Sequence, residues 1–301
     1  MPTNVDPSRD FTWQQEFRLP ATLAPPAAVC HPFLQRLHST LTAPLRPGHA
    51  LECDLARLHL IWTAGNAAAL ETALMLVSYS YGLRYLGHQD PLTAADLAIG
   101  PAHGANSRTL LALQEYEGGL LPVGTLTTGS GSDLDLFDLF EAAPNVRWPH
   151  QQAAGDAVRP GEVCRFGLHP LFDLLDQAAD PATRRRLDFY RRLILRRLTS
   201  ACLDWLIAGN ITVAYCVVGP HLRLFMRRSG MHVAPVAGVQ PRSTVAVTRM
   251  RRQFARYWRP DEAPNRQPAP HQLTGIIRPV AELPDLPAEV VAGRELALAV
   301  A

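Results

Sequence analysis

The sequence predicts an α/β (α+β) protein in which helices cover both faces of a mixed β-sheet. Two apolar, β-like segments, Thr109–Gln114 and Leu121–Thr128, flank Glu117-Gly118-Gly119 and predict an antiparallel hairpin. Between residues 161 and 218 a strand, a long amphipathic helix and a second strand follow one another, which predicts a crossover between parallel strands. With 301 residues, 47% of them hydrophobic, the chain is long enough to bury a substantial core.

Proline-rich segments flank the predicted domain. Residues 1–50 predict an irregular N-terminal arm with one short helix near Phe33–Leu41, and residues 259–301 predict a C-terminal tail of similar composition. A proline every few residues removes backbone donors and interrupts helices. We therefore expect a single domain over residues 51–258.

The first half of this domain begins with a strand at Leu51–Ile61 and a helix at Ala67–Tyr85. The helix is indicated by an apolar stripe at spacings of three and four residues: Leu70, Leu74, Val77, Tyr81 and Tyr85. After the hairpin, Leu134–Phe140 predicts one or two helical turns, and residues 142–160 predict a loop.

The second half begins with a short strand at Gly161–Leu168. Arg184–Ala208 predicts a long helix that Gly209-Asn210 terminates, and Ile211–Val218 predicts a buried, β-branched strand. A second helix and two final strands are expected at Pro220–Ser229, Met231–Val239 and Thr244–Val247.

Composition excludes several classes of function. The net charge of +2 does not by itself indicate a nucleic-acid partner. The five cysteines have no CxxC spacing and no histidines at metal-ligand intervals, so we expect reduced thiols, no metal and a cytoplasmic location. No membrane span is expected, because no apolar run approaches about 20 residues.

Four motifs in order resemble one family over about residues 65 to 250. They are Leu83-Arg84-Tyr85, the hairpin LLALQEYEGGLLPVGTL (110–126), Glu162-Val-Cys-Arg165, and Pro220-His221 followed by Phe225-Met-Arg-Arg-Ser-Gly230. This set resembles the Gcn5-related N-acyltransferases, and within them the acyl-homoserine-lactone synthases and the long-chain N-acyl amino acid synthases. The resemblance implies a sheet whose central parallel strands splay into a V beside a thioester site.

Two departures from the family pattern narrow this expectation. Lactone synthases carry an arginine just after the first hairpin, where this chain has Thr125-Leu-Thr127-Thr128, and this favours an N-acyl amino acid synthase. Relatives that use acetyl-CoA hold its pyrophosphate on a glycine-rich turn, but residues 169–181 contain no glycine and three acidic residues. Acyl carrier protein is therefore the expected acyl donor in preference to acyl-CoA, with no bound cofactor.

The resemblance implies that Glu162 is the general base for a small amine acceptor. Strict strand alternation places Glu162, Cys164 and Phe166 on one face and Arg165 on the other, unless a bulge intervenes. The family has such an irregularity, which Gly167 would permit, and backbone amides of residues 165–168 would then face the thioester oxygen. The structural alternative is a simple Glu162–Arg165 ion pair.

Further residues are expected to contact the substrate. We expect Arg165 to be catalytic together with Glu162. Arg165 and Arg84 would also hold an acceptor carboxylate, since guanidinium groups bind carboxylates in a bidentate manner. Phe166, Gly167 and His221 complete the expected substrate-binding set. Cys164 could form an acyl-cysteine, but no histidine lies near it in sequence, and a buried thiol is the favoured interpretation.

Arginines crowd the predicted long helix. Arg184, Arg185, Arg191, Arg192 and Arg196 are the expected docking residues for acyl carrier protein, which is acidic. The alternatives are an ordinary solvated helix face and nucleic-acid binding, the latter disfavoured because aromatic residues are not interleaved.

The function expected is transfer of a fatty acyl group from acyl carrier protein to an amino acid or similar amine. The alternatives are an acyl-homoserine-lactone synthase that uses S-adenosylmethionine, and a non-catalytic binding protein of the same fold.

Overall fold

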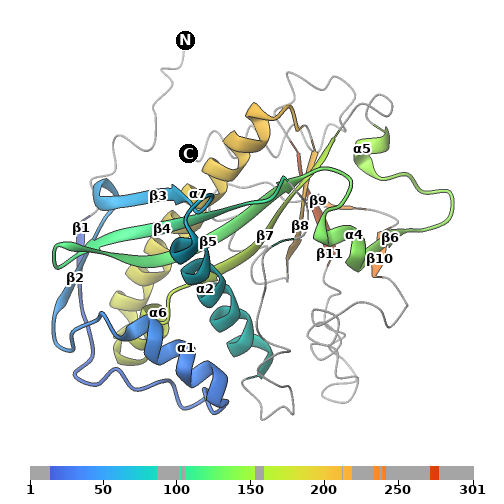
Figure 1. The fold of residues 1–301 in the computed structure, drawn as a ribbon. Helices are drawn as coiled ribbons and strands as arrows, with labels where there is room; N and C mark the ends of the chain where they lie inside the picture. Colours follow the sequence, from blue (N-terminus) through green and yellow to red (C-terminus); the bar gives the residue numbers. More distant parts are fainter. Residues whose placement is uncertain are drawn as a thin grey trace.

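A seven-stranded mixed sheet forms the centre of the protein, seen in a computed structural model (Figure 1). The structure describes residues 14–86, 102, 106–152, 159–211, 213–218, 234–236, 239–241 and 272–277. The sheet has the order β3-β4-β5-β7-β8-β11-β9. Its strands are β3 (Leu58–Trp62), β4 (Arg108–Tyr116), β5 (Gly119–Ser130), β7 (Pro160–Leu168), β8 (Val213–Val218), β9 (Ala234–Pro235) and β11 (Gln272–Ile277). All described pairs are antiparallel except β7 with β8, so the mixed sheet is confirmed.

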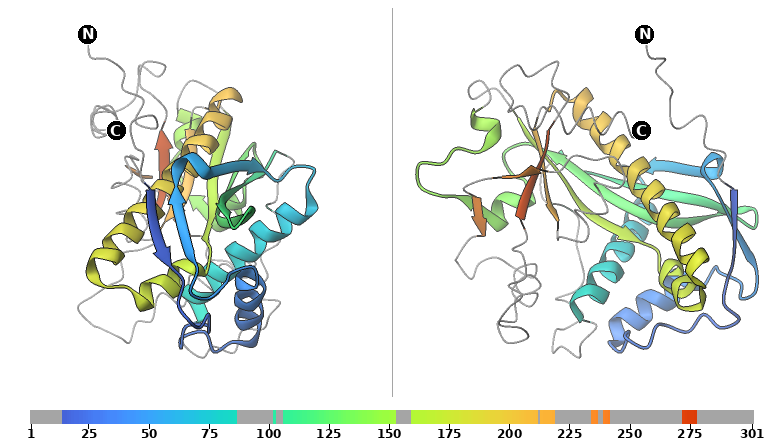
Figure 2. Two further views of the ribbon diagram at one scale, coloured as in Figure 1. Left: turned by 90° about the vertical axis from the view of Figure 1, so that its left-hand side faces the viewer. Right: turned by 180° about the vertical axis from the view of Figure 1, so that it is seen from behind.

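Helices cover both faces of this sheet, as predicted. One face carries α1 (Pro32–Thr42), α2 (Ala67–Leu86) and the short α4 (Asp135–Leu139), while the other carries α6 (Leu171–Ala178) and α7 (Pro181–Ala208) (Figure 2). On each face, one glycine of the sheet lies where a helix packs closely against it. A Cβ on Gly167 would meet the α2 backbone at 2.9 Å, and one on Gly124 would meet Ile194 of α7 at 3.0 Å.

The long helix and the hairpin form where the sequence predicts them. Asp180 caps α7 by accepting from the amides of Ala182 and Thr183, and Pro181 fits the first turn because its missing N–H has no partner there. In the hairpin, Glu117 and Gly118 take the positive φ angles that a tight turn requires.

Both predicted arms contribute ordered elements to the described part of the chain. β1 (Gln14–Arg18) pairs with β2 (Ala50–Asp54), and Leu34 of α1 packs against Gly82 of α2. β11, from the segment expected as a tail, pairs with β8 along six residues. Long-range pairing therefore brings proline-rich sequence into the fold.

Some elements differ from expectation. Asp54 caps a 3-10 turn (Leu55–Arg57), which divides the strand expected at Leu51–Ile61 into β2 and β3. The loop expected at residues 142–160 contains the helix α5 (Pro149–Gln152). At the end of the helical segment expected at Leu134–Phe140, the chain forms β6 (Phe140–Ala142), which pairs with β10 (Val239–Pro241), and the connection at residues 169–181 contains α6. The helix expected at Pro220–Ser229 and the strand at Thr244–Val247 lie outside the described residues.

The parallel strands β7 and β8 part soon after they meet. They share the pairs Pro160–Val213, Gly161–Ala214 and Glu162–Tyr215, after which β7 continues to Leu168 and β8 to Val218 without pairing to each other. Along that length β7 pairs with β5, and β8 pairs with β11. This pairing pattern agrees with the predicted splay of the parallel strands. The two strands separate after the Glu162–Tyr215 pair.

Candidate functional site

A β-bulge in β7 lies at the residues singled out from the sequence. Thr125 pairs with Gly167 and Thr127 with Cys164, so β7 holds one more residue than β5 over this interval. Arg165 has a φ of 56°, in the left-handed region that non-glycine residues rarely adopt. Such strain commonly persists at functional sites, where the surrounding structure holds it.

The bulge changes which side chains share a face. Arg165 is brought to the same α4 helix as Glu162: its Nη2 donates to Asp135 Oδ2 at 2.6 Å, while Leu136 N donates to Glu162 Oε2 at 3.2 Å. Phe166 is turned to the opposite face, where it joins the core cluster that contains Tyr190 and Ile194 of α7. Strict alternation therefore does not hold at Arg165 and Phe166. The bulge that was expected as its exception is present, and one inserted residue resets the two-residue period.

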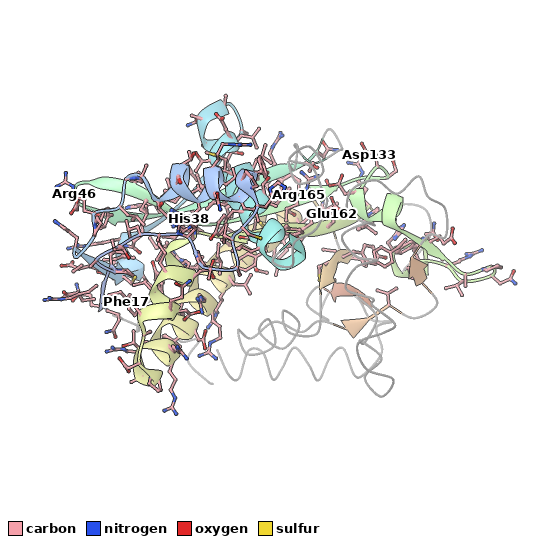
Figure 3. All side chains as sticks on the ribbon, turned by 90° about the horizontal axis from the view of Figure 1, so that it is seen from below. Phe17, His38, Arg46, Asp133, Glu162 and Arg165 are labelled. Atoms are coloured by element: carbon pink, nitrogen blue, oxygen red, sulfur yellow. The ribbon has the colours of Figure 1, made fainter. Side chains whose placement is uncertain are left out.

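Glu162 is a deeply buried carboxyl group. The residue is 1% exposed, and burial raises its pKa to about 7, with the Asp135 carboxylate acting in the same direction. The Leu136 amide and the Arg165 guanidinium act in the opposite direction because they stabilise the charged form. A carboxyl group that titrates near neutrality is suited to proton transfer. Figure 3 shows Glu162 and Arg165 near the middle of the sheet, far from Phe17 and Arg46.

Glu162 and Arg165 belong to one charged cluster. Asp135 pairs with Arg165 at 2.6 Å, with 11% and 8% of the two side chains exposed. Cys164 Sγ lies 3.8 Å from Glu162 Oε1, and burial followed by the Glu162 charge raises the pKa of this thiol well above its usual value. The thiol therefore remains protonated and acts as a weak donor to the carboxylate.

The same cluster has the spacing of a three-ligand metal set. One ligand atom from each of Asp135, Glu162 and Cys164 lies within 4.8 Å of the others. However, the guanidinium of Arg165 already neutralises Asp135, and a second cation would be repelled at that position. We assign no metal to the cluster.

The β5 strand provides the remaining wall beside Glu162. Thr128 donates from its hydroxyl to Glu162 O at 2.9 Å, and a Cβ on Gly129 would stand 3.6 Å from Glu162 Oε1. Thr127 shares a hydrogen bond with the hydroxyl of Thr109. Small, uncharged residues thus line β5 at this point.

A hollow of about 760 Å³ is bounded in part by α4. Its wall includes Phe137, Trp148 and His150, together with the charged residues Asp133 and Arg159. Glu162 does not belong to that wall. The hollow and the carboxylate are therefore separate features, linked through α4, which supplies Phe137 to one and Leu136 N to the other.

The other predicted site residues lie in different settings. Gly167 faces the α2 backbone and leaves no room for a side chain. Arg84 lies in the last turn of α2, but its side chain and the whole of His221 are outside the described part. Asp135 was not predicted; the only indication in the sequence was an acidic residue in a short helical segment after Gly129–Gly131.

The arginines of α7 divide into two groups. Arg191 is internal: it pairs with Asp176 and Asp188, donates to Phe172 O and lies over the Phe172 ring at 5.5 Å. Arg184 and Arg185 are exposed in the first turns, and Arg192 and Arg196 are half-buried. None of the helices that the structure describes is long and apolar enough to cross a bilayer.

Comparisons with known proteins give distant structural likenesses. Neither a protein-family model nor a curated protein matches the sequence. The structure is similar to that of FeeM, an N-acyl amino acid synthase from uncultured soil microbes, with 16% identity and a TM-score of 0.37 over 62% of this chain and 87% of that one. It is also similar to AtaTR bound with AcCoA, with 10% identity and a TM-score of 0.30 over 62% of this chain and 95% of that one. At these values the likenesses carry no argument about activity, which has to be argued from the site.

Proposed function

We propose that this protein is an N-acyltransferase that moves a fatty acyl group from acyl carrier protein to the amino group of an amino acid or similar small amine. The observation that supports this most directly is the bulge at Arg165, beside a carboxyl group with a pKa raised to about 7 and at the point where β7 and β8 part. A base, a kinked strand and a gap in strand pairing are features that suit attack on a thioester.

In the proposed reaction the acceptor nitrogen forms a bond to the thioester carbonyl carbon, and the C–S bond then breaks. Glu162 takes the proton from the amine through one water, and that proton leaves with the thiol. Amides of the bulge stabilise the oxyanion. We assign this role to the backbone within the bulge, between Cys164 and Gly167; beyond it, Leu168 N already donates to Ser80 Oγ.

Access to Glu162 requires a change at α4 or an ordered water, because the residue is only 1% exposed. The helix has only five residues, but it is held to β7 by the hydrogen bond from Leu136 N to Glu162 and by the buried Asp135–Arg165 ion pair. Because moving α4 would break that pair, proton transfer through one ordered water is the route we propose.

We propose that acyl carrier protein docks on the arginines of α7. Exposed Arg184 and Arg185 would orient an acidic acyl carrier protein, with Arg192 and Arg196 at the margin of the surface. Arg191 is assigned a structural role within this surface, since two carboxylates already hold it.

The test incubates the full chain with long-chain acyl carrier protein and a mixture of amino acids, with acyl-CoA and S-adenosylmethionine in separate arms, and detects products by mass spectrometry. An acyl amide that disappears in Glu162→Gln and persists in Glu71→Gln, an exposed α2 control, supports the proposal. A homoserine lactone would identify the alternative enzyme. Carrier binding without any product would identify a non-catalytic binding protein.

A further inference from the structure

One turn of α4 contacts both functional side chains of β7. Asp135 Oδ2 lies 2.6 Å from Arg165 Nη2, and the next residue, Leu136, donates its amide to Glu162 Oε2 at 3.2 Å. Neither contact follows from sequence proximity, and both involve side chains that are about nine-tenths buried or more. The short helix α4 therefore holds the side chains of both Glu162 and Arg165 in place.

The charges around Glu162 are few. Among the described residues, the charges that act on it are those of Asp135 from α4 and Arg165 from β7, together with backbone hydrogen bonds from Leu136 and Asp135. The neutral thiol of Cys164 lies 3.8 Å from Glu162 Oε1. β5 presents Thr128 and Gly129, which do not titrate. On β8 the paired residue is Tyr215, and its hydroxyl is engaged with His150 at 2.9 Å.

A buried guanidinium requires a carboxylate partner, because an unpaired charge in a protein interior is strongly destabilising. Two carboxyl groups of the cluster compete for Arg165, and Asp135 is the one that binds it. If Asp135 lost its charge, Glu162 would be the remaining carboxylate in this cluster. A direct Glu162–Arg165 pair would hold the carboxylate in its charged form and weaken it as a base.

We propose that Asp135 is a positioning residue: by binding Arg165, it keeps this cation from pairing with Glu162 and so preserves Glu162 as a base. The inference rests on the function proposed above. It assigns to Asp135 no contact with substrate. It makes the influence of Arg165 on Glu162 depend on whether Asp135 is charged.

The experiment measures the Glu162 pKa by NMR of ¹³C-carboxyl glutamate in the full chain without substrate, with Glu162→Gln used to assign the signal. Asp135→Asn should lower this pKa by about one pH unit or more, as expected for a new opposite charge at contact distance. In an Arg165→Gln background the same substitution should have a smaller effect, because only the loss of direct repulsion by Asp135 remains there. Asp135→Glu, which keeps the charge, should restore a value near that of the unmodified protein.

An equal effect of Asp135→Asn with and without Arg165 would overturn the proposal, because simple loss of charge repulsion would then explain it. Asp135→Ser is a second neutral variant in case the Asn variant does not fold. If both neutral variants fail to fold while Asp135→Asn/Arg165→Gln folds, the charge of Asp135 serves folding, and the positioning role is wrong.

Activity gives an independent readout. If the protein is an acyltransferase, the acid limb of its kcat/KM profile should move to lower pH in Asp135→Asn. Absence of activity in the unmodified protein with every donor would count against the proposed function, while the NMR result would still decide the role of Asp135.

Discussion

Ser80 of α2 takes the place of a neighbouring strand for Leu168 of β7. Its hydroxyl accepts from Leu168 N at 2.9 Å and donates to Leu168 O at 3.0 Å. Because β8 has already parted from β7, these backbone groups would otherwise have no strand partner on that side. One serine thus stabilises the splayed end of the central strand.

Ser80→Ala should lower the free energy of unfolding by about 1–3 kcal/mol, because it leaves a largely buried N–H and C=O without their partner. Chemical denaturation with the change followed by circular dichroism measures this. Thr72→Ala is the matched control, since the Thr72 hydroxyl bonds to Ala68 O within the same helix. A similar loss in both variants would contradict the role given to Ser80.

Gly167→Ala should be destabilising by about 1–3 kcal/mol through overpacking. The new Cβ would lie 2.9 Å from Leu76 C, Leu76 O and Val77 N, which are backbone atoms and cannot rotate away. Gly119→Ala is the control, because its Cβ would stand 3.6 Å from the nearest atom, Tyr116 O. Thermal unfolding that shows equal stability for the two variants would show that α2 does not press on β7 at this point.

Glu162→Gln should change stability in a pH-dependent way. The folded pKa is about 7 and the ordinary value is 4.5, so between these values the folded state binds more protons than the unfolded state. The unfolding free energy of the unmodified protein should therefore fall relative to Glu162→Gln as the pH rises from 4.5 to 7, by about 3 kcal/mol at most. A difference that stays constant from pH 4 to pH 8 would refute the raised pKa.

Substitution of the internal Arg191 and of the exposed Arg185 on α7 should have different effects. Arg191→Ala should lower the melting temperature, because it removes the partner of Asp176 and the contact with Phe172. Arg185→Glu should leave the melting temperature unchanged and weaken association with acyl carrier protein several-fold at low salt. Arg18→Glu, with an 85% exposed side chain on β1, controls for the change in net charge. Equal weakening by Arg18→Glu would remove α7 from the docking assignment.

Much of the fold could be predicted from local sequence. The helices α2 and α7 and the β4–β5 hairpin lie where apolar periodicity, a cap and a glycine turn indicate them. The pairing of β1 with β2, and of β11 with β8, could not be predicted in this way, because both bring proline-rich segments into contact with distant strands. Long-range pairing depends on which edges remain free, and local composition does not record this.

For the site, the sequence by itself determined that a glutamate, an arginine and a permissive glycine stand together on one strand. Only the tertiary structure decided which of them meet. The extra residue in β7 turns Phe166 into the core and brings Arg165 to the same helix, α4, that contacts Glu162. That helix also supplies Asp135, which pairs with Arg165. The physical reason is that strand alternation is a local rule with a period of two, whereas a bulge and an ion pair are set by the neighbouring strand and helix.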